Sequence, residues 1–167
     1  MNLAASLIGE IQHENNATLA YFEAIPDDQL EFKVHEKSFT IMQCASHIVE
    51  TFTWTPAMVD LDDFTLDMEN YQPFVASSKQ ELIDALKKNL EEAIAKIQTV
   101  SDEDMMKTWT MTVGGNKVME LPRIAVLKSM LVSHQIHHRG QLSVYLRLAG
   151  ASVPSAYGPT ADFPAFG

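Results

Sequence analysis

Three histidines lie close together near the end of the chain, in residues 133–141, which read Ser-His-Gln-Ile-His-His-Arg-Gly-Gln. Two of them, His134 and His138, are four residues apart, so on a helix they project from one face, one turn apart. Helices that hold zinc use histidines at this spacing. In metalloproteases a glutamate follows the first histidine, but here Gln135 stands in that place. The pattern therefore predicts a divalent-metal site and excludes a metalloprotease of that type.

The two histidines also continue the apolar pattern of their own segment. Residues at alternating steps of four and three form a seam, which we expect to face the protein interior: Leu127, Leu131, His134, His138, Gln141, Tyr145 and Leu148. Buried imidazole nitrogens need partners, and a metal ion supplies one to each ring. His137 lies beside this seam, on a stripe that contains the small residues Ser133 and Gly140.

A third ligand must come from elsewhere in the chain, and His47 is the best candidate. It lies in the middle of segment 39–58, which is apolar on almost every side and is therefore expected to be buried. His13 and His35 are weaker candidates because polar or charged residues surround them. The alternative is that each buried histidine only forms hydrogen bonds within the core. Cys44, three residues before His47, is either a further ligand or nucleophile, or a buried apolar cysteine.

Four amphipathic helices are expected to position these residues. Apolar residues recur at three- and four-residue spacings in the segments 2–24, 39–58, 79–99 and 122–149. A long connection at 60–73 follows the second helix, and residues 109–121 read as a small hairpin around Gly114-Gly115. The fold class is therefore all-α: a four-helix bundle with a long crossover connection and a small β-hairpin before the last helix.

Local signals predict where these helices begin and end. Ser38 and Ser78 are expected N-caps, the latter with Glu81 in a capping box. Pro56 is expected to kink or end the second helix, and Pro122 to lie in the first turn of the fourth. Residues 101–104 read as a turn, and an extended tail follows Gly150.

The composition limits the class of protein. The 167 residues, 46% of them apolar and 20% charged, are expected to form one domain over 1–167. A single cysteine excludes a disulfide framework and fits the reducing cytoplasm. The net charge of -10 argues against binding to nucleic acid, and no apolar run is long enough to cross a membrane. The charge is uneven: residues 1–106 hold 20 acidic and 6 basic groups, whereas residues 107–167 hold 2 and 6.

The histidine segment and the residues after it resemble the DinB family of bacterial damage-inducible proteins. The resemblance rests on residues 133–142, Tyr145-Leu146-Arg147, Gly150, Pro154 and Tyr157-Gly158-Pro159, and on the upstream segments 37–40 and 45–48. It implies a four-helix bundle, often dimeric. It also implies a divalent metal held by one histidine of the second helix and by the first and last of the His-x-x-His-His group, here His47, His134 and His138.

The resemblance leaves several activities open. The superfamily includes thiol-dependent transferases and isomerases that use low-molecular-weight thiols. We therefore expect a metal-dependent enzyme acting on small molecules, either a thiol S-transferase or a hydrolase, with zinc or nickel as the metal and iron or manganese as the alternatives. The competing interpretation is a non-catalytic, stress-related protein in which the metal is structural.

Other residues near the motif carry weaker expectations. Gln141 could orient a ligand or substrate, and Glu50 is either a general base or a surface carboxylate. Arg139 and Arg147 either recognise an anionic substrate or pair with acidic residues of the other helices. The His137 stripe would let a second helix approach closely, so a homodimer is expected.

Overall fold

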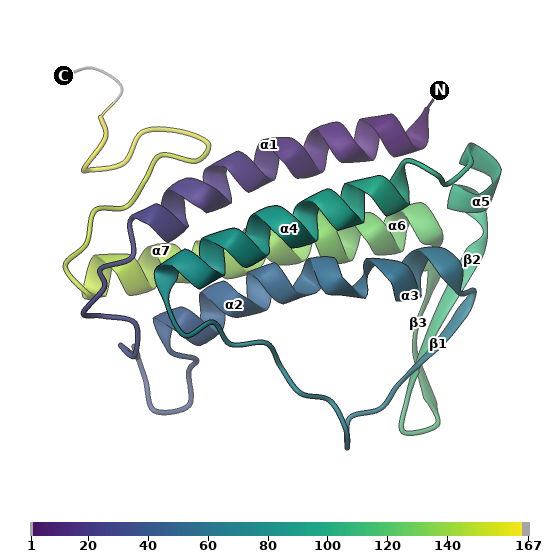
Figure 1. The fold of residues 1–167 in the computed structure, drawn as a ribbon, viewed down its shortest axis with the longest axis horizontal. Coiled ribbons are helices and arrows are strands. Elements are labelled where there is room, and N and C mark those ends of the chain that lie inside the picture. The colour runs from purple at the N-terminus through teal and green to yellow at the C-terminus, as the bar shows by residue number, and fades with distance from the viewer. Residues whose placement is uncertain (1, 165–167) are drawn as a thin grey trace.

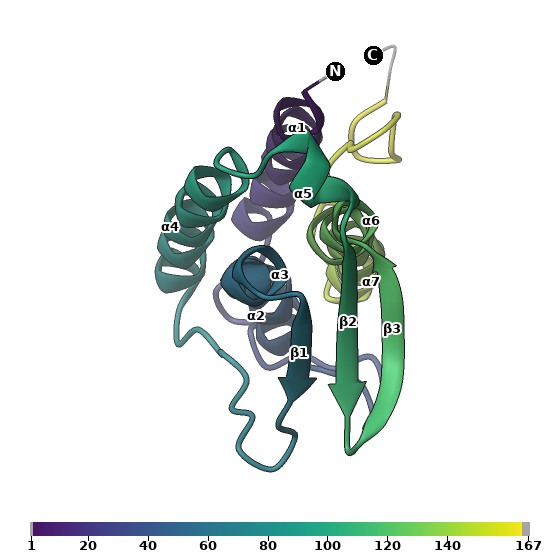
Figure 2. The ribbon, with the colours of Figure 1, turned by 90° about the vertical axis from the view of Figure 1, so that its right-hand side faces the viewer.

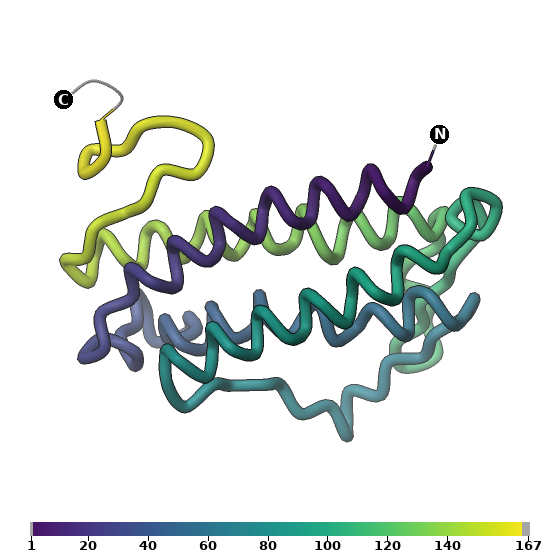
Figure 3. Tube along the Cα trace, turned by 45° about the horizontal axis from the view of Figure 1, so that its top comes forward, coloured from purple at the N-terminus to yellow at the C-terminus, as the bar shows by residue number. Residues whose placement is uncertain are grey.

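The computed structural model describes residues 2–164 and shows a mostly helical bundle with a small sheet, which confirms the predicted fold class (Figure 1). The bundle has four long helices, or layers. The first is α1 (Leu3–Glu23), and the second consists of α2 (Ile41–Thr51), η1 (Phe52–Trp54) and α3 (Thr55–Asp60). The third is α4 (Lys79–Ile97), and the last consists of α6 (Arg123–Lys128), η2 (Ser129–Ser133) and α7 (His134–Leu148). The first and last layers run in one direction, and the middle two run in the opposite direction (Figure 1). Because α3 and α4 follow one another in the chain and run in the same direction, the segment between them must return along the length of the bundle (Figure 3). This segment is the predicted crossover.

A three-stranded sheet stands beside one end of the bundle (Figure 2). The predicted hairpin is present: β2 (Thr108–Val113) and β3 (Asn116–Pro122) are antiparallel, joined by Gly114 and Gly115 at φ of 54° and 80°. Positive φ is accessible to glycine without steric cost. The third strand, β1 (Asp63–Leu66), was expected to be part of the connection; it pairs in parallel with β2. Long-range pairing of this kind leaves little local signal.

The second helix begins and continues differently from the prediction. Thr40, not Ser38, is the N-cap: its hydroxyl accepts from the Gln43 N–H, and the Gln43 side chain accepts from the Thr40 N–H. Pro56 does not end the helix, because a 3₁₀ turn precedes it and the proline falls in the first turn of α3. The Phe52 carbonyl, which Pro56 cannot bond, accepts from the Thr55 hydroxyl at 2.7 Å.

Three other boundaries also differ from those predicted. The turn expected at 101–104 is instead the start of a short helix, α5 (Asp102–Met106), which buries Met105. Ser78 caps α4 as predicted, but the Glu81 carboxylate accepts from Ser77 rather than from Ser78, so the expected capping box is only half formed. The last helix begins at Arg123, one residue later than predicted, with Pro122 as its N-cap.

The last helix contains a π-turn, η2, immediately before the three histidines. A π-turn holds one residue more than an α-turn, so the side chains after it are displaced by one position, about 100° of rotation. The predicted seam therefore holds only in part beyond Leu131, where His138 and Tyr145 are buried as expected. Gln135 and Leu142 are completely buried, whereas the predicted seam residues Gln141 and Leu148 are exposed.

A buried ion pair joins the first and last helices. The Arg139 guanidinium lies 2.6 Å from the Glu14 carboxylate, and both side chains are less than a tenth exposed. Arg139 also donates to the Glu14 carbonyl and the Thr18 hydroxyl, and Tyr157 of the C-terminal tail hydrogen-bonds to Glu14. This network fixes α7 against α1 and holds the tail to both. Within residues 2–164, no helix combines the length and apolar character needed to cross a bilayer.

The Arg139–Glu14 pair leads to a prediction about stability. Arg139→Met leaves the Glu14 carboxylate buried without its cation, so urea denaturation is expected to show a loss of about 3–5 kcal/mol in the free energy of unfolding. Arg147→Met is the control, because the Arg147–Asp162 pair is largely exposed, and its expected loss is at most about 1 kcal/mol. Equal losses in the two variants would contradict the prediction.

Candidate metal centre

The fold brings together the three histidines singled out in the sequence. His47 comes from the middle of α2, and His134 and His138 come from the first turns of α7. The Nε2 atoms of His47 and His134 are 3.2 Å apart, and those of His134 and His138 are 2.8 Å apart. One donor atom from each ring lies within 4.8 Å of the other two. His13 and His35 are exposed and do not belong to this group.

The hydrogen bonds around the triad decide which nitrogen of each ring points inward. His47 Nδ1 lies 3.0 Å from Glu50 Oε2, and His138 Nδ1 lies 2.7 Å from Gln141 Oε1. Since both oxygens are acceptors, the Nδ1 atoms carry the protons and the Nε2 atoms present lone pairs. The two lone pairs converge on the His134 ring, and a cation held among the three nitrogens would accept both of them.

These residues fit a divalent metal. Two nitrogens bound tetrahedrally at about 2.0–2.1 Å from zinc are about 3.3 Å apart, and the two Nε2 separations, 3.2 and 2.8 Å, are close to that value. Ligating histidines ordinarily donate their other N–H to a carboxylate or carbonyl, as His47 and His138 do here. The donor set, its spacing and its supporting hydrogen bonds therefore agree.

Glu50 supports the triad from α2. The expectation that it is a surface carboxylate is wrong: Glu50 is only 4% exposed. Its Oε1 accepts from the Phe74 N–H at 3.2 Å, so the same carboxylate holds His47 and the crossover. Burial raises the pKa of Glu50, but hydrogen bonds from His47, Tyr71 and the Phe74 N–H outweigh this effect and hold it below its ordinary value. Glu50 is therefore an ionised partner of His47.

Other residues singled out in the sequence lie in different positions. Gln141 is exposed but reaches back to His138, whereas His137 is exposed and, within residues 2–164, makes its ring contact with His138, at 4.8 Å between centroids. Arg139 pairs with Glu14 of α1, which was one of the two alternatives for it, whereas Arg147 pairs with Asp162 of the C-terminal tail rather than with another helix. Neither guanidinium contacts the triad.

Cys44 is not a ligand in this arrangement. Its thiol is buried and donates to the His138 carbonyl over 3.6 Å. Burial raises the pKa of the Cys44 thiol to about 12, so the thiolate needed for nucleophilic attack or metal binding is disfavoured. Among residues 2–164 no fourth histidine, cysteine or carboxylate joins the three-histidine group.

Two aromatic rings beside the triad were missed in the sequence. The Trp54 ring centroid lies 5.7 Å from that of His47 and 5.9 Å from that of His134. The Phe39 ring lies 5.9 Å from that of His47. A signal for Trp54 was present, because residues at i, i+3 and i+7 share one helical face and therefore align His47, Glu50 and Trp54. Phe39 precedes the helix, so periodicity did not place it.

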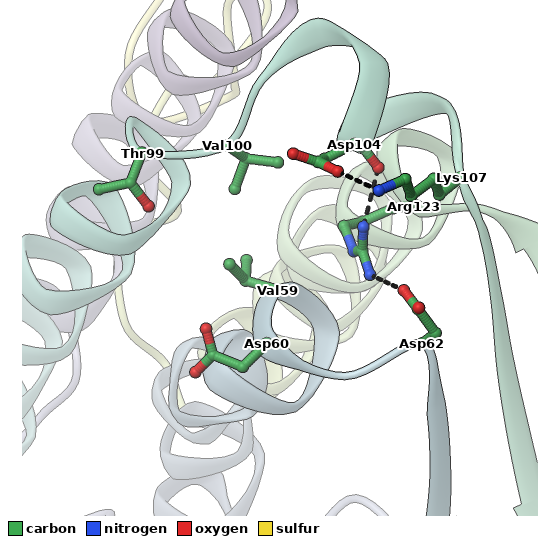
Figure 4. A pocket seen from close by; sticks show the side chains of 8 residues that line it. All are labelled: Val59, Asp60, Asp62, Thr99, Val100, Asp104, Lys107 and Arg123. Atoms are coloured by element: carbon green, nitrogen blue, oxygen red, sulfur yellow. Dashed lines mark hydrogen bonds and ion pairs between the residues drawn. The ribbon is translucent and has the colours of Figure 1, made fainter.

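A polar cavity of about 320 Å³ lies among α3, α5 and α6, apart from the elements that carry the triad (Figure 4). Its charged side chains already have partners: Asp62 pairs with Arg123 and Asp104 with Lys107, as the dashed lines show, and Asp60 pairs with Lys96. The buried Arg123 also donates to the carbonyls of Met58, Leu61 and Asp104. The charged groups that line the cavity therefore serve to hold α3, α5 and α6 together.

Comparison with known proteins agrees with this geometry. The sequence model of the DinB family matches residues 1–165. The chain belongs to the DinB family. YrdA of Bacillus subtilis (strain 168), an uncharacterised protein, is 26% identical over 151 residues, which are 90% of this chain and 86% of YrdA.

Solved structures share the fold of this DinB-family chain. A DinB-like protein of Bacillus subtilis, YjoA, superposes with a TM-score of 0.70 at 20% identity, covering 90% of this chain and 97% of its own. YfiT from Bacillus subtilis, described as a probable metal-dependent hydrolase with an unusual four-helix bundle topology, has a TM-score of 0.68 at 14% identity and covers 89% of each chain. At these identities the likeness concerns the fold.

The electrostatics of this DinB-family site keep His134 and His138 neutral. Burial, reinforced by the His138, His47 and His137 rings, lowers the pKa of His134 to about 4 from 6.5. Burial also lowers the pKa of His138, although the hydrogen bond to Gln141 opposes the shift. Neutral imidazole is the form that binds metals, so both rings are ready to act as ligands at neutral pH.

The lowered pKa of His134 predicts how the stability of the metal-free protein depends on pH. Below pH 6.5 the unfolded chain binds a proton at His134 that the folded chain binds only near pH 4. The contribution of neutral His134 to the free energy of unfolding is therefore fully present above about pH 6.5 and is lost as the pH falls to about 4. Urea denaturation over this range should show a steeper loss in the native protein than in His134→Gln. If the stability of the two proteins falls equally with pH, the lowered pKa of His134 is refuted.

Proposed function

We propose that this DinB-family chain is a divalent-metal-dependent hydrolase of small molecules, with His47, His134 and His138 as the metal ligands. The proposal is supported by the converging imidazoles, by the similarity of the fold to YfiT, and by the description of YfiT as a probable metal-dependent hydrolase. Zinc or nickel suits three imidazole donors best, with iron or manganese as alternatives.

One observation carries the proposal: the site has three protein donors and no fourth among residues 2–164. Structural zinc sites are closed by four protein ligands, whereas catalytic sites keep a position for water or substrate. His47 and His134 are also only partly buried, so both rings keep some contact with solvent. An open, reachable site favours catalysis over a purely structural metal.

Neighbouring side chains orient the three histidines for metal binding. Glu50 holds His47, and Gln141 holds His138, each with its Nε2 lone pair directed inward. Burial keeps His134 unprotonated at neutral pH. A divalent metal held by these three nitrogens would supply Lewis acidity, polarising a substrate carbonyl and making water or a thiol more acidic. The Trp54 and Phe39 rings border the same place.

Two alternatives remain as outcomes of the test. A thiol S-transferase would use the same centre to bind a low-molecular-weight thiol as the thiolate, supplied by a co-substrate because Cys44 is buried. A non-catalytic, stress-related protein would use the metal only to stabilise α2 against α7. The first predicts turnover only when a thiol is added, and the second predicts no turnover at all.

The experiment starts with protein stripped by a chelator and titrated calorimetrically with Zn²⁺ or Ni²⁺. We expect one ion per chain, loss of binding in His47→Gln and His134→Gln, and affinity weakened about 10–100-fold in Glu50→Gln. His137→Gln, which replaces an exposed histidine outside the triad, is the matched control and should bind normally. Folded native protein that binds no divalent metal refutes the proposal.

Activity is then measured on a panel of small esters and amides, with and without added thiols. Metal-dependent hydrolysis that needs no thiol and disappears in His134→Gln is the expected result. Turnover that requires a thiol supports the transferase. Metal binding that only raises the melting temperature, without turnover, supports the structural role.

We also propose that the protein is a homodimer. The face of the last helix that carries Ser133 of η2 and His137 and Gly140 of α7 is exposed, and Val144 and Leu148 on the same face are 55% and 60% exposed. Small residues allow helices to approach closely, and exposed apolar side chains favour burial against a second copy.

Light scattering coupled to size-exclusion chromatography tests the dimer. The native protein is expected at twice the 18.6 kDa mass of one chain, and Val144→Glu at the single mass, because a charge would be buried in the interface. Met68→Glu, at an exposed apolar side chain of the crossover, is the control and should remain dimeric. A native monomer would refute the dimer.

A further inference from the structure

Two aromatic side chains lie beside the triad: Phe39 is exposed, and Trp54 is partly buried against the core. Phe39 is 46% exposed although its ring lies 5.9 Å from that of His47. A ring that served only to seal the triad from water would be buried. An exposed apolar surface of this size is unfavourable in water, and contact with a bound apolar group recovers that free energy.

Trp54 complements Phe39 from the other end of the same helix. Phe39 directly precedes the N-cap of α2, and Trp54 ends the 3₁₀ turn after α2. The Trp54 ring lies within 6 Å of both His47 and His134, and it is only partly buried. Two of the three imidazoles are therefore bordered by aromatic surface.

The charges around the triad point to the same kind of ligand. Among residues 2–164, Glu50 is the only charged side chain that makes a hydrogen bond, ion pair or ring contact with the triad. Arg139 and Lys128, the cations nearest to His134 and His138 in sequence, are held by Glu14 and Glu10. A bound metal ion would attract the reacting atom of the substrate, but the rest of the substrate meets rings and no cation.

We infer that Phe39 and Trp54 form the substrate-binding wall of the candidate metal centre, and that the substrate carries an uncharged aromatic or apolar group next to its reacting atom. This inference rests on the proposed metal centre and adds a substrate class to it. Phe39 and Trp54 determine specificity: they would contact the group beside the reacting bond rather than the bond itself.

Hydroxamic acids test the inference without turnover, because they bind protein-held metals through two oxygens and can carry different side groups. Binding of three of them to the zinc-loaded protein is measured calorimetrically: acetohydroxamate, benzohydroxamate and 4-carboxybenzohydroxamate. We expect benzohydroxamate to bind about tenfold tighter than acetohydroxamate, since stacking and burial of one ring are worth that much. The carboxylate is expected to weaken the binding of the aromatic ligand.

Variants identify the residues responsible. Phe39→Ala and Trp54→Leu should each lower the affinity for benzohydroxamate about fivefold and leave that for acetohydroxamate unchanged. Phe163→Ala removes an aromatic side chain that is 51% exposed in the C-terminal tail, and it should change neither. Because Phe39 is exposed, its replacement leaves the core intact and the variant remains informative if Trp54→Leu folds poorly.

The outcomes separate this inference from the proposed hydrolase. Preferential binding of benzohydroxamate without hydrolysis of any ester or amide supports the aromatic wall and contradicts the activity. If the protein hydrolyses its substrates but binds the three hydroxamates equally, the aromatic substrate-binding wall is contradicted and the hydrolase activity is supported. Tightest binding of the carboxylated hydroxamate would lead to the same conclusion. A protein that takes up no zinc overturns both.

Discussion

The five-residue π-turn of the last helix determines how this bundle can carry a polar centre. By displacing the helical register by one position, it directs His134 and His138 toward α2 and Gln135 and Arg139 toward α1. An uninterrupted α-helix would place Gln141 and Leu148 in the interior instead. The imidazoles meet across one interface, and across the other Arg139 pairs with Glu14 and Gln135 Oε1 accepts from the Thr18 hydroxyl.

The second helix supplies the other half of the centre. His47, Glu50 and Trp54 occupy one face at three- and seven-residue spacings, so one helix contributes a candidate ligand, the carboxylate that orients it and an aromatic neighbour. Glu50 also accepts from the Phe74 N–H, and the Ser46 hydroxyl accepts from the Ala76 N–H. Two hydrogen bonds thus hold the crossover between α3 and α4 against α2, the helix that carries His47.

The charge distribution has a different consequence in the folded protein from the one the composition indicates. The basic excess of residues 107–167 includes Arg123, Arg139 and Arg147, which pair with carboxylates: Arg123 and Arg139 with the distant Asp62 and Glu14, and Arg147 with Asp162 of the adjoining tail. These arginines tie the bundle, the sheet and the tail together. Phe39, Trp54 and Glu50 contact the triad, in keeping with the uncharged substrate group that we infer.

The sequence by itself determined the four helices, the hairpin and the three histidines, because apolar periodicity, a glycine pair and an i, i+4 histidine pair are local signals. Only the tertiary structure decided the rest. The pairing of β1 with β2, the burial of Glu50 and the partner of Arg139 depend on contacts between distant segments. Phe39 reaches His47 from outside the helix, so helical spacing could not reveal it. The π-turn leaves no simple pattern in the sequence, yet it decides which side of the last helix faces each neighbour.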